Sequence, residues 1–294
     1  MQFVHLGIHT EFSITESIVR IPDLVKVAVQ DEMPALALTD LSNLHAAIKF
    51  YEACLKKGIK PILGSVIRLN DAEHRATLLA MSNTGWRNLT EIVSRGFIEG
   101  QQLGIPCVKK DWVLEQAEDL IVLLGQHSDV GKMLCSSNPQ KAEPLLEAWI
   151  EKFGNQVYLA LTRTERVGEE DYIQQAVKLA AKYQLGVVAH NDVHFIEQDD
   201  FEAHEARVCI ADGYVLGDDK RPKTYSSEQY FKTAVQMSEL FADLPAALEN
   251  SYHIAKRCNV TLQLGTYFLP DFPIPDGYTI DTYFEHLSRE GLEQ

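Results

Sequence analysis

The residues with the clearest chemical potential are histidines and carboxylates near the N-terminus and around residue 190. His5, Gly7 and His9 alternate with apolar residues in an N-terminal stretch that has a strand-like pattern. Two histidines spaced two residues apart on one strand could share a metal ion, but Gly7 stands at one of those positions. His5 and His9 are roughly 13 Å apart along an extended strand, too far to share an ion with ligand distances near roughly 2 Å. The stretch therefore indicates either a metal enzyme or the shell of one.

Seven short apolar segments predict the strands that would position such residues. They are expected at residues 3–13, 34–38, 60–69, 76–81, 119–124, 156–161 and 187–190, with segments of helical periodicity between most of them. Continuous apolar runs are typical of parallel strands that are covered on both faces. Polar residues follow several of these runs, among them Asp40, Asp192 and His194. In a β/α barrel, the chemistry is found at that rim.

These elements predict an α/β fold built from parallel β/α units. An open, doubly wound sheet is the alternative, but no glycine-rich phosphate loop follows any of the strands. From about residue 215 the pattern changes to a polar loop and two helices, near 234–241 and 244–257. We therefore expect a first domain of residues 1–270, with a barrel core of about 1–215 and a helical extension of about 216–270.

The last residues, 271–294, are expected to be a connector and the start of a further region. Residues 281–294 begin an amphipathic helix through Tyr283, Phe284 and Leu287, which has no obvious partner in the chain. This suggests an N-terminal piece of a longer protein.

Composition and charge exclude several classes of protein. The chain has 294 residues, of which 46% are hydrophobic and 23% charged, as in ordinary globular proteins. The net charge of −15 disfavours non-specific binding to nucleic acid. The sequence shows neither a signal peptide nor a membrane span, and its five cysteines have no Cys-x-x-Cys spacing. These features suit a reducing cytoplasm.

Motifs along nearly the whole chain give it a family resemblance. They are residues 3–13, Met33–Asp40, Gly58–Gly64, Asn88–Leu89, Asn191–Phe195, Lys220–Pro222, Glu239–Asp243, Ile254–Asn259 and Tyr267–Pro270. Together and in this order they resemble the N-terminal PHP (polymerase and histidinol phosphatase) domain of bacterial DNA polymerase III α subunits, the replicative polymerases. The resemblance implies a distorted seven-unit (β/α) barrel, similar to a TIM barrel. It also implies a site for up to three metal ions in the active members, which use it to hydrolyse phosphoesters.

When the metal ligands of that family are mapped onto this chain, several are missing. The first histidine of the His-x-His pair corresponds to Gly7, a later histidine to Leu41 and a glutamate to Val66. The histidine before the fourth strand falls on Arg75, although His74 is adjacent. His9, Glu16, Asp40, Asp192 and His194 remain, and Asp129 lies in a region where the alignment has gaps.

The resemblance and these losses favour a site without catalytic metal. Gly7 and Val66 offer no ligand atom, and Arg75 brings a fixed positive charge that could neutralise leftover carboxylates in place of a metal. His9, Asp192 and His194 could still hold one zinc or manganese ion, since three ligands and a water satisfy zinc. We prefer a buried, hydrogen-bonded polar network at the barrel rim, with no catalytic residue and no cofactor in this domain.

The favoured function is that of a non-catalytic domain in a DNA-directed DNA polymerase. By resemblance it would support the polymerase domains of the same chain and bind the proofreading exonuclease (ε) subunit, with DNA contacted only indirectly. Magnesium is expected only in the polymerase domain, which is absent here. One alternative is an active metal-dependent phosphoesterase or 3′–5′ exonuclease. Another is a stand-alone phosphatase of the histidinol-phosphate type, which the polymerase-like segments after residue 219 disfavour.

Overall fold

The computed structural model describes residues 3–70, 73–267, 269 and 271–293. The chain divides into two compact units, residues 1–261 and residues 262–294, and each is described by itself. The residue at position 270, where the sequence predicts the end of the first domain, lies outside the described residues.

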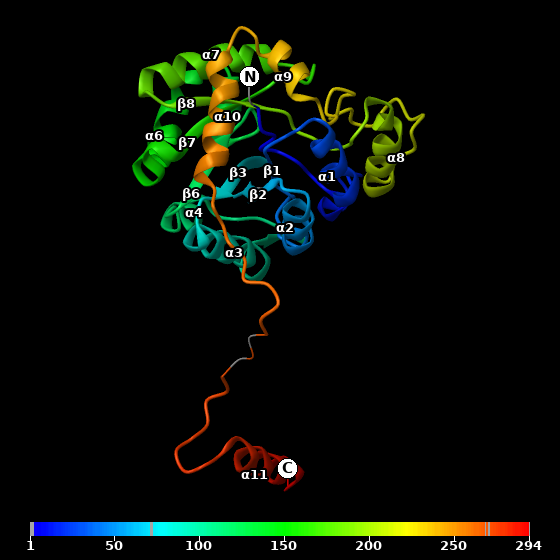
Figure 1. Cartoon of the computed structure of the whole chain (residues 1–294). Coiled ribbons are helices and arrows are strands. Elements are labelled where there is room, and N and C mark those ends of the chain that lie inside the picture. Colours follow the sequence, from blue (N-terminus) through cyan, green and yellow to red (C-terminus); the bar gives the residue numbers. More distant parts are fainter. Residues whose placement is uncertain (1–2, 71–72, 268, 270, 294) are drawn as a thin grey trace. The chain divides into compact units, whose positions relative to one another are not determined.

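Six strands of the first unit form one curled sheet, shaped like half of a barrel (Figure 1). Their order in the sheet is β1-β2-β3-β6-β7-β8. The strands are β1 (Ala35–Leu38), β2 (Lys60–Leu69), β3 (His74–Ala80), β6 (Leu120–Leu124), β7 (Val157–Thr162) and β8 (Gly186–His190). A separate two-stranded hairpin consists of β4 (Gln101–Gln102) and β5 (Ile105–Pro106).

Helices fill most of the connections between these strands. The α-helices of the first unit are α1 (Ile21–Gln30), α2 (Ala47–Lys56), α3 (Asn83–Ile98), α4 (Lys110–Glu115), α5 (Asp129–Leu134), α6 (Ala142–Phe153), α7 (Glu169–Tyr183), α8 (Phe201–Asp212), α9 (Ala234–Leu240) and α10 (Pro245–Arg257). Short 3-10 turns are η1 (Glu11–Ser13), η2 (Pro139–Lys141), η3 (Gly154–Gln156) and η4 (Gln198–Asp200).

The expectation of parallel strands is wrong for one strand. β3 pairs antiparallel with both β2 and β6, whereas the other pairs in the sheet are parallel. The reason is the short link between β2 and β3, residues 70–73. A parallel neighbour requires a crossover of a dozen or more residues, so this link allows only a hairpin.

The N-terminal stretch is extended, but only Ile8 forms a β-bridge, with Val193. The Ala37 amide, in β1, donates to the His5 carbonyl at 3.0 Å. The Thr39 amide, just after β1, donates to the Ile8 carbonyl at 3.0 Å. On its other side, the His9 amide donates to the Val193 carbonyl at 3.0 Å. The segment thus lies between β1 and the chain that follows β8. The described residues thus show six regular strands and this irregular segment, and the seven-unit barrel remains a prediction.

The core of the first unit joins the N-terminal segment, the sheet and α10. Val4, Ile62, Leu123 and Ile254 belong to one cluster of buried side chains. The Val4 amide also donates to the Ser251 hydroxyl of α10 at 3.0 Å. The predicted helix near 244–257 therefore belongs to the barrel core itself, because its apolar face covers the sheet.

The second unit contains α11 (Ile280–Glu293), at the place where the sequence predicts an amphipathic helix. None of the described residues of α11 is buried. Across the described part of the chain, no helix has the length and apolar character that a membrane crossing requires. All five cysteines are free thiols.

Candidate functional site

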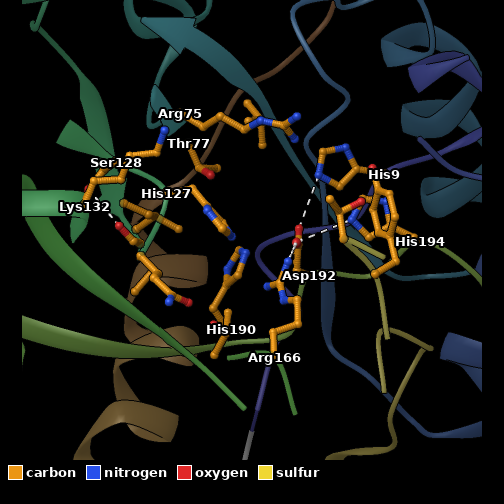
Figure 2. A pocket seen from close by; sticks show the side chains of 18 of the residues that line it. His9, Arg75, Thr77, His127, Ser128, Lys132, Arg166, His190, Asp192 and His194 are labelled. Atoms are coloured by element: carbon orange, nitrogen blue, oxygen red, sulfur yellow. Dashed lines mark hydrogen bonds and ion pairs between the residues drawn. The ribbon is translucent and has the colours of Figure 1, made fainter. Parts of the chain in front are cut away.

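A cavity of about 370 Å³ opens at the rim where β6, β7 and β8 end (Figure 2). β3 reaches the same rim with its first residues because it runs antiparallel to its neighbours. The lining residues include His9, Val66, Arg75, Thr77, His127, Ser128, Lys132, Thr162, Arg166, His190, Asp192, His194 and Tyr225. Polar residues from the N-terminal segment and from the ends of several strands therefore converge at one place.

Three residues predicted from the sequence, His9, Asp192 and His194, come together at the edge of this cavity. Each offers one ligand atom, and these atoms all lie within 4.8 Å of one another. The Nε2 atoms of His9 and His194 are both 3.4 Å from the Asp192 carboxylate. The two imidazole rings are stacked, with centroids 4.5 Å apart. Backbone pairing of the N-terminal segment with Val193 produces this arrangement, because it places His9 beside the residues that follow β8.

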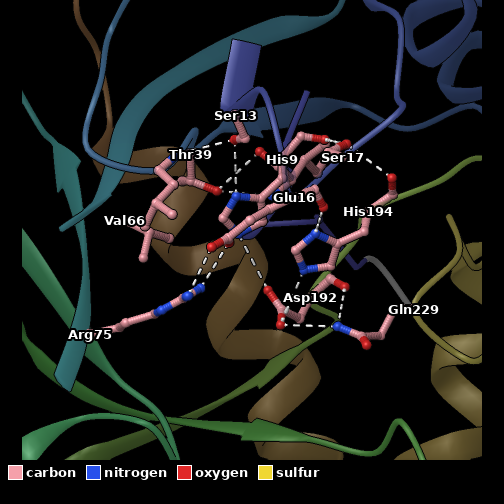
Figure 3. Close-up of polar contacts among 12 residues, drawn as sticks. His9, Ser13, Glu16, Ser17, Thr39, Val66, Arg75, Asp192, His194 and Gln229 are labelled. Atoms are coloured by element: carbon pink, nitrogen blue, oxygen red, sulfur yellow. Dashed lines mark hydrogen bonds and ion pairs between the residues drawn. The ribbon is translucent and has the colours of Figure 1, made fainter. Parts of the chain in front are cut away.

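Hydrogen bonds on the far side of each ring determine which nitrogen carries the proton (Figure 3). The Ser13 hydroxyl donates to Asp40 at 2.7 Å, so Ser13 must accept from His9 Nδ1, 3.2 Å away. His194 Nδ1 donates to the Glu16 carbonyl. In the neutral tautomers, the Nε2 atoms of His9 and His194 therefore both point a lone pair at the Asp192 carboxylate. Lone pairs repel a carboxylate, so this arrangement needs a proton or another cation between the nitrogens and Asp192.

The charge on Asp192 is strongly stabilised. Burial alone would raise the pKa of this carboxyl group, but His194, His9 and the Arg166 guanidinium hold it well below its usual range. For His194 the balance is reversed, since burial lowers its pKa more than Asp192 raises it. The group is thus built around an ionised carboxylate with basic nitrogens on both sides.

The carboxylate of Glu16 is paired with arginine side chains. Arg75 donates from Nη1 and Nη2 to the two carboxylate oxygens of Glu16, each at 2.9 Å, and Arg68 lies 3.4 Å from one of them. Burial would raise the pKa of Glu16, but Arg75 and His9 lower it overall. A bidentate guanidinium pair uses both oxygens of the carboxylate. Glu16 is therefore ionised but already paired with a cation that the protein supplies.

Arg166 is a second arginine at the site, and our sequence analysis did not identify it. Its Nη1 is 3.4 Å from Asp192, and its Nε is 2.9 Å from the Thr164 hydroxyl and 3.3 Å from Glu169. Arg166 follows the C-terminal end of β7, so the rule that polar residues gather past strand ends could have found it.

The position of Gly7 is filled by another side chain. A methyl group at Gly7 would lie 2.0 Å from Cε1 and 2.2 Å from Nε2 of His190. Contacts this short do not occur, so the His190 ring takes the space that a side chain at position 7 would need. Burial lowers the pKa of His190 to about 4, and its Nδ1 has no hydrogen-bond partner within the described chain. A neutral imidazole therefore fills the space that a side chain at position 7 would need.

The other predicted positions lie outside the His9–Asp192–His194 group. Leu41 and Val66 are bridged to each other and bring apolar side chains to this rim. Asp40 is buried and accepts hydrogen bonds from the Thr10 amide at 2.6 Å and from Ser13. Asp129 pairs with Lys110 Nζ at 2.7 Å and is absent from the described lining of the cavity. Asp40 and Asp129 thus serve local hydrogen-bond networks.

These residues fit a cluster of three ions poorly. Ligand atoms are missing at Gly7, Leu41 and Val66, and Arg75 occupies the carboxylate of Glu16. Only the His9–Asp192–His194 group offers three ligand atoms near one another among the described residues. The site could therefore hold one ion at most with the side chains as they are placed.

Known proteins resemble this chain in sequence. The sequence model of the PHP domain family matches residues 5–164. The chain is 49% identical over 300 residues to DNA polymerase III subunit alpha of Pseudomonas aeruginosa, covering 100% of this chain and 26% of the relative. It is 46% identical over 299 residues to the same subunit of Vibrio cholerae, with coverage of 100% and 26%. The chain spans about a quarter of the length of these relatives.

Among solved structures, one similar chain is a two-domain protein from Bacteroides vulgatus that contains a predicted PHP-like metal-dependent phosphoesterase. The TM-score is 0.44 at 14% identity, and the match covers 66% of this chain and 52% of the other.

Proposed function

This chain belongs to the PHP domain family, and from that premise we propose that it is a non-catalytic domain of a replicative DNA polymerase III α subunit. Its role is to support the polymerase domains of the same chain and to bind the proofreading exonuclease (ε) subunit. The support for the parent protein is the similarity to subunits of that name, of which this chain spans about a quarter.

The observation that supports the absence of catalysis is that protein groups fill or pair positions where the resemblance implies metal ligands. The His190 ring occupies the space beside Gly7, and the Arg75 guanidinium binds both oxygens of Glu16. Arg166 adds a second positive charge next to Asp192. Arginine carries a permanent charge but cannot activate a water molecule as a metal does. Two arginines thus balance the remaining carboxylates without providing hydrolytic chemistry.

The remaining polar network has a structural use. Ser13, His9, Asp192 and His194 form a continuous chain of contacts that ties the N-terminal segment to the residues after β8. Ser17 adds to it, because its hydroxyl donates to the carbonyls of both His9 and His194. Buried networks of this kind fix one arrangement of the elements that they join. The former site would therefore hold the open edge of the half-barrel together.

The partners follow from the same assignment. The chain carries a net charge of −15, so DNA contact would be indirect, through the polymerase domains. Magnesium would be needed only in those domains, and the protein would work in the cytoplasm. Isothermal titration calorimetry of this chain with the ε subunit tests the partner assignment. We expect binding at micromolar concentrations, and a titration without heat at tens of micromolar would contradict it.

One observation favours a second function, that of a metal-dependent phosphoesterase. The Nε2 lone pairs of His9 and His194 converge on Asp192, as they would around a single zinc or manganese ion. Such an ion would supply a polarised water or a Lewis acid. His9, Asp192 and His194 would hold it, and Arg166 and Lys132 would attract an anionic substrate into the cavity.

Metal analysis combined with an activity assay separates the two functions. The purified chain would be incubated with Zn²⁺ or Mn²⁺, desalted, and examined for bound metal and for hydrolysis of a phosphoester substrate. We expect far fewer bound ions than chains, and no hydrolysis. About one ion per chain, with activity that Asp192→Asn and His194→Ala both abolish, would overturn the non-catalytic assignment. Asp129→Asn is the matched control, because that carboxylate lies outside the cavity lining.

A further inference from the structure

The turn that follows η1 is strained at Ile14. This residue has a φ of +55° and a ψ of −72°, and the Thr15 amide donates to the Ser13 carbonyl at 2.7 Å. These features define the rare form of γ-turn, whose central residue ideally has a φ of about +75° and a ψ of about −65°. Among the described residues other than glycine that have a positive φ, Ile14 is the only one with a β-branched side chain. Such a side chain fits this conformation worst, so the turn stores strain.

The Ile14 side chain does not offset this strain, because it is 65% exposed and gains little from burial. A strained conformation persists only where the surrounding structure determines it. Arg207 of α8 donates to the Ile14 carbonyl. Before the turn, the Ser13 hydroxyl donates to Asp40 at 2.7 Å and accepts from the Leu41 amide at 3.1 Å. The start of the turn is thus anchored in the buried chain after β1.

The end of the turn is held by Glu16. The Glu16 carbonyl accepts a hydrogen bond from His204 Nε2 at 2.9 Å and another from His194 Nδ1. The Glu16 carboxylate is the one that Arg75 binds through both oxygens (Figure 3). The strained turn is therefore clamped between Ser13 and Glu16, and both of these residues belong to the polar network at the rim.

One of these clamps faces the cavity. The hydrogen bonds of Ser13 and those to the Glu16 carbonyl are buried. The Arg75 side chain, in contrast, lines the cavity and is 34% exposed. The Arg75–Glu16 ion pair is therefore the clamp through which the cavity and the strained turn can influence each other.

We propose that residues 13–16 form a strained latch, which the Arg75–Glu16 ion pair holds closed. When the latch opens, the turn relaxes and Glu16 leaves Arg75. The guanidinium is then free to face the cavity beside Arg166 and Lys132, which also line it. The strain favours the open state and the ion pair opposes it, so the latch sets how much positive charge the cavity presents. This device goes beyond the proposed function and does not depend on it.

Amide hydrogen exchange tests the latch, with two amides as reporters of its opening. The Glu16 amide donates to the Ser13 carbonyl at 3.3 Å, and the Leu41 amide donates to the Ser13 hydroxyl oxygen. In Ile14→Gly, both amides should exchange roughly threefold slower or more, because relief of the strain outweighs the freedom that glycine gains in the open state. Val167→Gly is the matched control, since Val167 is exposed in a loop and its φ is not positive. It should leave both reporters unchanged.

Glu16→Gln acts in the opposite direction. It removes the charge that Arg75 binds, so the Leu41 amide should exchange about tenfold faster or more, while amides in the centre of β7 keep their rates because the opening is local. Unchanged exchange of the Leu41 amide in this variant would overturn the proposal. So would an Ile14→Gly protein whose reporters are slowed no more than those of Val167→Gly, a result that does not require Glu16→Gln to fold. Either result would leave the non-catalytic assignment standing, which is read from metal binding and phosphoester hydrolysis instead.

Discussion

The contact between Gly7 and His190 gives a prediction whose size follows from the structure. In Gly7→Ala, the new methyl group must displace a buried ring that lies 2.0 Å from its ideal position. Overpacking of this kind typically costs about 1–3 kcal/mol. The φ angle of Gly7 is not positive, so alanine brings no backbone strain and recovers roughly 0.4–1 kcal/mol through the unfolded state. We expect a net loss of about 1–2 kcal/mol in the free energy of unfolding.

A double-mutant cycle identifies the cause of that loss. His190→Ala removes the ring and should destabilise the protein by itself, because it leaves a void beside the cavity. In Gly7→Ala/His190→Ala, the methyl group has room, so the double variant should be more stable than the sum of the two single losses by about 1–2 kcal/mol. Urea unfolding followed by circular dichroism measures all four proteins.

Gly217→Ala is the control for this cycle. No described atom outside its own neighbours lies within 4 Å of a methyl group there, and its φ angle is not positive. This variant should be neutral or slightly stabilised. If the losses from Gly7→Ala and His190→Ala simply add, the His190 ring is not what excludes a side chain at position 7, and the reasoning fails.

Three further predictions concern the charges, the pH dependence and the second unit. Arg75→Met leaves the buried Glu16 carboxylate without its main partner and should cost about 3 kcal/mol of unfolding free energy. Adding Glu16→Gln to this variant should recover part of that loss. An unchanged urea midpoint in Arg75→Met would contradict the pairing. Burial lowers the pKa of His5 to about 3 and that of His204 to about 4. As the pH drops below 6.5, these two histidines are therefore protonated in the unfolded chain before they are protonated in the folded chain, and the free energy of unfolding should fall. The loss between pH 7 and pH 4.5 should be about 2–3 kcal/mol for each histidine, and a flat profile would contradict their neutral burial. Removal of residues 262–294 should leave the melting temperature of the first unit unchanged, because the described residues of α11 are not buried; a fall of several degrees in calorimetry would show otherwise.

The sequence predicts the elements of the fold better than the way in which they pair. Apolar runs locate β2, β6, β7 and β8 closely, because a buried strand must be apolar on both faces. The direction of β3 was missed because the pattern of apolar residues does not depend on which way a strand runs. Only the length of the link from β2 determines it. The N-terminal stretch has a strand pattern, but Ile8 alone forms a β-bridge there.

The candidate site could be predicted in part, for a similar reason. His9, Asp192 and His194 follow apolar runs that end at the same rim, so their meeting could be inferred from strand topology. The ion pair of Arg75 with Glu16 matches the expected neutralisation of a leftover carboxylate. Whether that arginine stands where a metal once bound remains a prediction. Asp129 begins α5 and pairs with Lys110, and its place among the rim residues remains a prediction.

The roles of His190 and Gly7 could not be predicted from the sequence. The two residues are 183 positions apart, and their complementarity in size appears only when the N-terminal segment lies beside β8. In the sequence, Gly7 predicts by resemblance that a ligand is lost, but it does not predict what fills the space.

The most direct test of the non-catalytic assignment is a crystal structure of the chain grown with Zn²⁺, with an anomalous difference map recorded at the zinc edge. We expect Arg75 on Glu16, the His190 ring against Gly7, and no cluster of anomalous peaks at the rim. Two or more zinc peaks bound by His9, Glu16 and Asp192, with Arg75 turned away, would contradict this assignment.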